Sequence, residues 1–161
     1  MLIKKVIEYG VPCNIDFINQ GDRFVIDKAS SMTGISKEKI RVLDCQHSEI
    51  PNILATYDCG IVMVESSYWR RVCSPTKLGE YLASGLPVIS LNGIDSIDDL
   101  SVRTECVATI SSQELLGHFQ DGRVQEIISF IRSTGVIQKC QALAQDEYDL
   151  EMAGKLEVAL Y

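Results

Sequence analysis

The stretch from Cys73 to Ser90, CSPTKLGEYLASGLPVIS, constrains the fold more than any other part of the sequence. Ser74 is typical of a helix N-cap, and Pro75 of the first helical position, where a missing N–H costs nothing. Apolar residues then recur at helical spacing as far as Gly85, whose permissive backbone predicts the end of the helix. The apolar residues 88–91 that follow predict a buried parallel strand. The stretch therefore predicts a loop, a crossover helix and a strand that returns to a sheet.

The N-terminus of this helix is suited to binding a phosphate group. Backbone N–H groups in a first helical turn are free donors that carry partial positive charge. Lys77 is a poor partner for the helix dipole but a good one for a bound anion, and Glu80, on roughly the same side, offers a carboxylate to hydroxyl groups. The residues alone leave plainer interpretations open: residues 74–76 as a good cap and first turn, and Lys77 and Glu80 as ordinary surface charges.

Strands and helices alternate along the rest of the chain. The predicted strands lie at residues 13–18, 40–43, 59–64, 88–91 and 106–110. Helices are predicted after Met1, after Asp22, over residues 48–57, from residue 74, from Ser111, around residues 124–131 and in the tail. The pattern predicts one α/β domain, a doubly wound and mainly parallel sheet with helices on both faces.

Two parts of this prediction concern burial. The helix after Asp22 is expected to turn Val25, Ala29 and Met32 inward. The strand at residues 59–64, which is nearly all apolar, is expected to be buried on both faces.

Ligands of such sheets bind at the carboxyl ends of the strands, where the winding reverses. The loops that leave those ends include residues 44–47 and 65–74. We therefore expect a site where these two loops converge on the helix that begins at residue 74.

Composition excludes several classes of function. A net charge of −7 argues against a nucleic-acid-binding domain, which usually shows a basic patch. No apolar run approaches the roughly 20 residues of a membrane span and no signal peptide opens the sequence, so a cytoplasmic protein is expected. The six cysteines include no C-x-x-C pair, and His47 and His118 lie far apart, so no metal site is expected.

Two blocks of the sequence carry a resemblance to a known family. Residues 74–90 (SPTKLGEYLASGLPVIS) resemble the donor-site helix of retaining glycosyltransferases with the GT-B fold, family four in particular. Residues 40–64 (IRVLDCQHSEIPNILATYDCGIVMV) resemble the family's strand, loop, helix and strand just upstream. The resemblance implies a Rossmann-like fold, the C-terminal and donor-binding half of a GT-B enzyme.

The resemblance also implies roles for particular residues. The diphosphate of the donor would be bound by Ser74, Pro75, Thr76 and Lys77. Glu80 would bind the ribose, and the loop containing Cys45 and Gln46 would meet the nucleobase. The donor would be a UDP- or GDP-linked sugar, with no cofactor and no metal ion.

The sequence departs from the family pattern at two points. The family places another glutamate eight residues before Glu80, where this chain has Val72, so the sugar contact would fall to Glu65 or Tyr68. Tyr68 is equally interpreted as part of an interface patch. The family's first strand, with an Arg and Lys loop that binds the diphosphate, is also missing. The strands at 13–18 and 59–64 would then pair directly, or a partner such as a second copy in a homodimer would supply a strand, or the sheet would be rearranged.

The function that follows is transfer of a sugar from a nucleotide diphosphate to a glycan or lipid-linked acceptor, as in polysaccharide biosynthesis. The acceptor-binding N-terminal domain is absent from the sequence, so this chain alone is expected to be inactive and to reach the inner face of a membrane only through that domain. No catalytic residue is identified. The alternative is a non-catalytic binding or regulatory module. A receiver-like signalling domain and a dinucleotide oxidoreductase fit less well, because Asp16 and Asp58 are misplaced for the first and no G-x-G-x-x-G follows a strand for the second.

Overall fold

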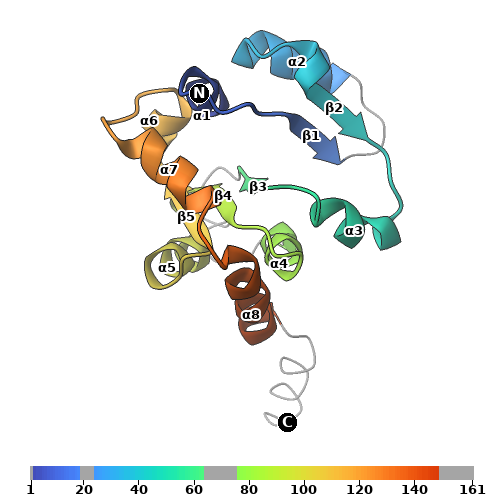
Figure 1. Cartoon of the computed structure of the whole chain (residues 1–161), viewed down its shortest axis with the longest axis vertical. Helices are drawn as coiled ribbons and strands as arrows, with labels where there is room; N and C mark the ends of the chain where they lie inside the picture. Colours follow the sequence, from blue (N-terminus) through green and yellow to red (C-terminus); the bar gives the residue numbers. More distant parts are fainter. Residues whose placement is uncertain (1, 19–23, 64–75, 149–161) are drawn as a thin grey trace. The chain divides into compact units, whose positions relative to one another are not determined.

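The computed structural model describes residues 2–18, 24–63 and 76–148 (Figure 1). Its strands are β1 (Ile15–Ile18), β2 (Ile40–Leu43), β3 (Gly60–Val62), β4 (Val88–Leu91) and β5 (Val107–Ile110). Its α-helices are α1 (Leu2–Glu8), α2 (Phe24–Thr33), α3 (Ile50–Leu54), α4 (Thr76–Ala83), α5 (Asp95–Arg103), α6 (Ser112–Leu115), α7 (Arg123–Ile131) and α8 (Val136–Tyr148). Two short 3₁₀ helices are η1 (Lys37–Lys39) and η2 (His47–Glu49). The alternation of strands and helices confirms the predicted α/β class.

All strand pairs in the described residues are parallel, as predicted, and they form two small sheets. β1 pairs with β2, with Ile15 opposite Ile40. β4 lies between β3 and β5, with Val88 opposite both Gly60 and Val107. The three arrangements expected for the missing strand stay predictions.

The chain divides into two compact units. We call residues 1–50 and 112–128 the first unit, and residues 51–111 and 129–161 the second unit. The sheet β1–β2 belongs to the first unit, and the sheet β3–β4–β5 to the second.

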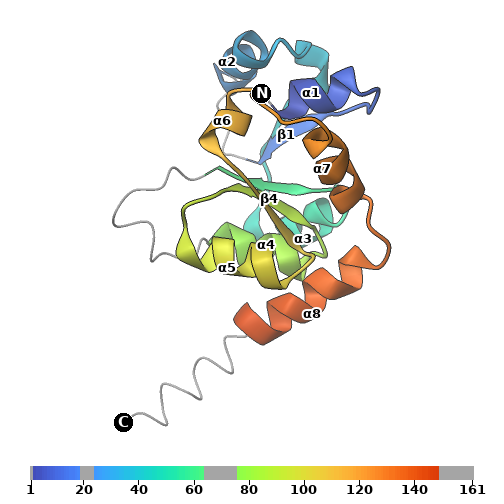
Figure 2. The ribbon, with the colours of Figure 1, turned by 90° about the vertical axis from the view of Figure 1, so that its left-hand side faces the viewer.

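The second unit has a closed apolar core. All four residues of β4 are buried, as predicted for that strand. Helices α4, α5 and α8 lie on one side of the sheet, and α4 packs against α8 (Figure 2). The core between these helices and the sheet consists of Val62, Leu78, Leu82, Val88, Ile94, Ile97, Leu100, Cys106, Val107, Val136, Cys140, Leu143 and Ala144.

The strand β3 corrects one prediction about burial. It was expected to be buried on both faces, but Ile61 is 40% exposed. Gly60 and Val62 are the buried residues of this strand. β3 is an edge strand of its sheet, and the alternation of side chains along a strand turns Ile61 away from the face that Gly60 and Val62 share.

In the first unit, helix α2 corrects a second prediction about burial. Met32 was expected to point inward and is 67% exposed. The buried and half-buried residues of α2 are Val25, Ile26, Ala29, Ser30 and Thr33. Met32 lies roughly 90° around the helix from the centre of this side, so it faces away from the residues that are buried. The predicted helix end at Gly34 is confirmed by a φ of +68°.

The structure also redraws some helix boundaries. The helix predicted over residues 48–57 is shorter, with η2 leading into α3. The helix predicted from Ser111 ends early, as α6, and leaves Leu116 76% exposed. Helix α5 was not predicted at all.

Candidate functional site

The candidate site is built on helix α4, whose C-terminal end has the geometry that the sequence predicts. The N–H of Leu86 donates to the carbonyl of Tyr81, and the N–H of Gly85 donates to the carbonyl of Leu82, both at 2.9 Å. Gly85 has a φ of +82°, in the left-handed region. These two bonds and this conformation form a Schellman motif, which satisfies carbonyls that the helix end would otherwise leave unpaired.

Leu78 and Leu82 hold α4 in place through the core, where both are fully buried. Two glycines allow close approach of neighbouring elements. A Cβ atom on Gly79 would lie 3.0 Å from the ring of Tyr148 in α8. A Cβ atom on Gly60 in β3 would lie 2.4 Å from the ring of Tyr81. Helix α4 is therefore fixed by α8 on one side and by β3 on another, which suits it to present side chains at a constant position.

Lys77 and Glu80 lie together on the outer side of α4. The Lys77 ammonium donates to Glu80 Oε2 at 2.8 Å, and the two side chains are 58% and 32% exposed. Their predicted position on one side of the helix is confirmed. Exposed pairs at this helical spacing contribute only about 0.3–0.5 kcal/mol, so a ligand can separate them at little cost.

Tyr81 is the half-buried neighbour of this pair. Burial is the main cause that raises the pKa of its phenol, Lys77 opposes the rise, and Glu80 adds to it. The phenol therefore stays protonated at neutral pH, and its ring covers Gly60 in the second unit.

Cys45 and Gln46, the predicted nucleobase loop, lie in the first unit. The backbone N–H of Gln46 donates to Glu49 Oε2 at 2.8 Å, and the Glu49 N–H returns a bond of 2.9 Å to the Gln46 carbonyl. This reciprocal capping arrangement starts η2 and occupies the backbone of Gln46. Cys45 is half-buried.

The remaining predicted site residues lie outside the described residues. They are Ser74 and Pro75 of the diphosphate site, and Glu65 and Tyr68 of the sugar site. Thr76, the first described residue of α4, is exposed.

Asp98 holds a loop of the second unit by a contact that the sequence analysis did not predict. Its Oδ2 accepts the N–H of Gly93 at 2.8 Å, which pins the loop at the carboxyl end of β4. Its buried Oδ1 has no hydrogen-bond partner within the described ranges. The contact was not predicted because α5 itself was not predicted.

Two further classes of site are a metal centre and a membrane-spanning helix. Residues 2–18, 24–63 and 76–148 contain no group of three or more His, Cys, Asp or Glu side chains that could hold a metal ion. Among the helices of the same residues, none combines the length and the apolar character needed to cross a membrane.

Comparison with known proteins identifies no relative of this chain. No model of a protein family, no curated protein and no solved structure matches the chain.

Proposed function

We propose that this chain is the nucleotide-diphosphate-sugar-binding C-terminal domain of a GT-B glycosyltransferase that transfers a sugar to a glycan or lipid-linked acceptor. In this proposal the two sheets belong to a doubly wound, Rossmann-like architecture. The observation that supports it best is the accessible pair of Lys77 and Glu80 on a helix that the core holds in place.

The two members of the pair have different roles. The Glu80 carboxylate accepts hydrogen bonds from the two ribose hydroxyls, and bonds to a charged acceptor are among the stronger ones. The Lys77 ammonium turns from Glu80 to the diphosphate, beside the N-terminal amides of α4. The first turn of α4 carries no acidic residue, so nothing in that turn repels the anion.

The chemistry of transfer belongs to the complete enzyme. Cationic side chains and a helix N-terminus stabilise the leaving diphosphate where its charge develops, so the reaction as proposed requires no metal. In this proposal the complete enzyme supplies the acceptor-binding domain and an Arg and Lys loop, and the chain by itself is expected to bind donor weakly and to transfer nothing.

Calorimetric titration of the full chain with UDP, GDP, UDP-glucose and GDP-mannose tests the proposal. We expect saturable binding of one nucleotide series. Glu80→Gln is expected to weaken it by roughly 10- to 100-fold, because a hydrogen bond to a charged group contributes about 1.5–3 kcal/mol. Lys77→Met is expected to reduce diphosphate binding while affinity for the nucleoside alone stays unchanged.

Glu105→Gln is the matched control. Glu105 forms an exposed ion pair with Lys139 in the same unit, so its loss removes an equivalent pair away from α4. Equal weakening by both substitutions would contradict the role of Glu80. Absence of saturable binding to every nucleotide would favour the non-catalytic module instead.

A further inference from the structure

The last turn of α8 lies beyond the part of the helix that is buried. The buried residues of α8 end at Ala144, and residues 145–147 are exposed. Glu147 joins this turn to α5, and Tyr148 joins it to α4. The position of the turn therefore depends on individual side-chain contacts rather than on a stripe of buried apolar residues.

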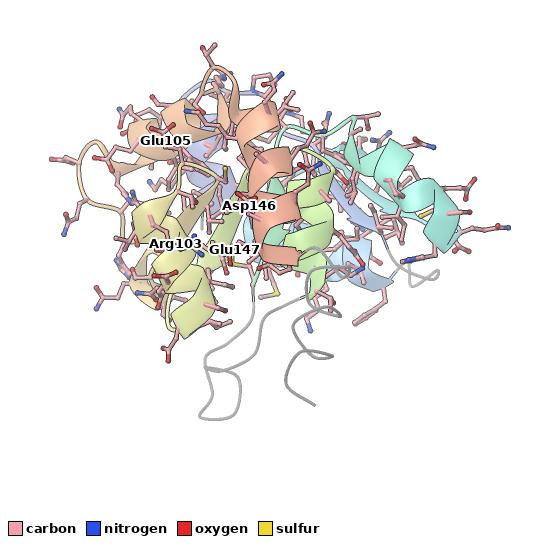
Figure 3. All side chains as sticks on the ribbon, turned by 90° about the horizontal axis from the view of Figure 1, so that it is seen from below. Arg103, Glu105, Asp146 and Glu147 are labelled. Atoms are coloured by element: carbon pink, nitrogen blue, oxygen red, sulfur yellow. The ribbon has the colours of Figure 1, made fainter. Side chains whose placement is uncertain are left out.

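Arg103, the last residue of α5, holds Glu147. Its guanidinium donates to Glu147 at 2.7 Å and to Asp99, one turn earlier in α5, at 2.6 Å. Figure 3 shows Arg103 and Glu147 side by side, with Asp146 in the same turn of α8. Because a guanidinium is planar and its donors are fixed in direction, the bond to Asp99 orients Arg103 toward Glu147.

Tyr148, the residue after Glu147, lies against α4. Its ring packs on the core of the second unit, and a Cβ atom on Gly79 would lie 3.0 Å from that ring. Gly79 stands between Lys77 and Glu80 in the sequence. The backbone that carries this pair is therefore the backbone that the Tyr148 ring contacts.

We propose that Arg103 is a positioning residue for the candidate site. It holds the last turn of α8 through Glu147, so that Tyr148 in turn keeps the first turns of α4 in place. Lys77 and Glu80 then face a ligand in one arrangement instead of several, which favours binding. The positioning of α4 does not depend on what the site binds, whereas its consequence for nucleotide affinity rests on the proposed function.

A second ion pair on α8 provides a contrast. Lys139, nearer the start of the helix, pairs with Glu105. The buried residues Val136 and Cys140 already hold this part of α8 against the core. Loss of the Lys139 pair should therefore leave α4 undisturbed, although it removes an exposed ionic contact from the same helix.

Hydrogen–deuterium exchange of the full chain without nucleotide tests the positioning. Glu147→Gln should speed exchange of the amides of residues 80–84 by roughly 2- to 5-fold, as expected for the loss of one exposed ion pair. Exchange in β4 should stay unchanged, which distinguishes local loosening of α4 from a loss of stability in the whole unit. Asp146→Asn, which removes the same charge from the same turn, and Lys139→Met are the matched controls and should change neither.

Three results of this experiment would overturn the proposal. They are unchanged exchange of α4 in Glu147→Gln, an equal increase in β4, and an equal increase of α4 exchange in Asp146→Asn. The last result would show that the charge of the turn matters and that its contact with Arg103 does not.

A double variant tests whether Arg103 acts through Tyr148. Tyr148→Ala should speed exchange of the same amides by more than Glu147→Gln does, because it removes the ring contact itself. Arg103→Met should speed it in the wild-type chain and cause no further change when added to Tyr148→Ala. Additive effects of the two substitutions would show that Arg103 acts by another route and would contradict the proposal.

Calorimetric titration with the nucleotides named above measures the consequence for the ligand. Glu147→Gln should weaken nucleotide binding by the same roughly 2- to 5-fold, and Asp146→Asn should leave it unchanged. Equal affinity of the wild type and Glu147→Gln would overturn the role of this contact in binding. A wild-type chain that binds no nucleotide would contradict the proposed function, and the exchange experiment would still decide whether Arg103 positions α4.

Discussion

The two units bury their apolar residues to very different extents. In the second unit the sheet β3–β4–β5 is covered by three helices, and its core unites residues from strands, helices and connecting segments. In the first unit every residue of β1 is only half-buried. Among the residues of the first unit that the structure describes, the buried apolar side chains are Leu2, Val6, Ile35, Ile40, Val124 and Ile127.

The difference in burial indicates which unit contributes more to the free energy of unfolding. A two-stranded sheet is marginally stable without a third strand or a well-packed helix, whereas a three-stranded sheet with a covered face is stable by itself. Hydrophobic stabilisation grows with the apolar area removed from water. The second unit, which carries α4, should therefore be the more stable one, and the site residues Lys77 and Glu80 rest on it.

The largest expected effect compares one truncation in each unit. Leu82→Ala empties a fully buried position of α4 and should lower the free energy of unfolding by about 2–5 kcal/mol. Leu43→Ala in β2 removes a half-buried side chain of the same size and should cost clearly less. Urea denaturation of both variants measures the difference. Equal losses would mean that the two units are equally well packed.

A second test concerns the contact between β3 and α4. Gly60→Ala places a methyl group where the ring of Tyr81 lies, and we expect a loss of about 1–3 kcal/mol in the free energy of unfolding. Tyr81→Leu removes the ring. The double variant should be more stable than the sum of the two single losses predicts, and additive losses in this double-mutant cycle would refute the contact.

The first unit contains one polar contact that partly offsets its small core. Arg41 donates to both carboxylate oxygens of Asp16, its cross-strand neighbour, and the Asp16 side chain is only 2% exposed. Arg41→Met should destabilise the protein by about 1–3 kcal/mol, because a carboxylate shielded from water loses these bonds. Arg103→Met, which breaks exposed pairs in the second unit, should cost less. The opposite order in thermal unfolding would show that burial of Asp16 does not matter.

The smallest effect is a dependence on pH. The hydrogen bond with Lys139 is the main cause that lowers the pKa of Glu105 below 4.5. A lowered pKa gives stability that is complete above about pH 4.5 and is lost as the pH falls through the pKa of the folded state. The difference in Tm between the wild type and Glu105→Gln should therefore shrink as the pH is lowered from 6 to 3. A difference that grows with acid would contradict the ion pair.

Local signals in the sequence predicted the parts of the fold that depend on local physics. The end of α4 at Gly85, the strand that follows it and the pairing of Lys77 with Glu80 were all predicted, because glycine, proline and helical spacing act over a few residues. Exposure of Ile61 was not predicted, since the position of β3 at a sheet edge depends on distant strands. Helix α5 was missed because only two of its residues, Ile97 and Leu100, are buried, which gives little apolar periodicity.

The candidate site was predicted in part for the same reason. Residues of one helix are placed relative to one another by helical geometry, so the arrangement of Lys77 and Glu80 followed from their spacing. The role of Asp98 depends on a loop that folds back onto α5, and no spacing rule applied to a helix that was not predicted. That Cys45 and Gln46 bind the same ligand as Lys77 and Glu80 stays a prediction.

Hydrogen–deuterium exchange of the full chain under native conditions tests the central claim most directly, that the second unit is the stable support of α4. Buried strands exchange only when their unit opens, so the time course reports local stability. We predict that the amides of β4, β5 and α4 exchange orders of magnitude more slowly than those of β1 and β2. Equal protection in the two units, or faster exchange in β4 than in β2, would contradict the account.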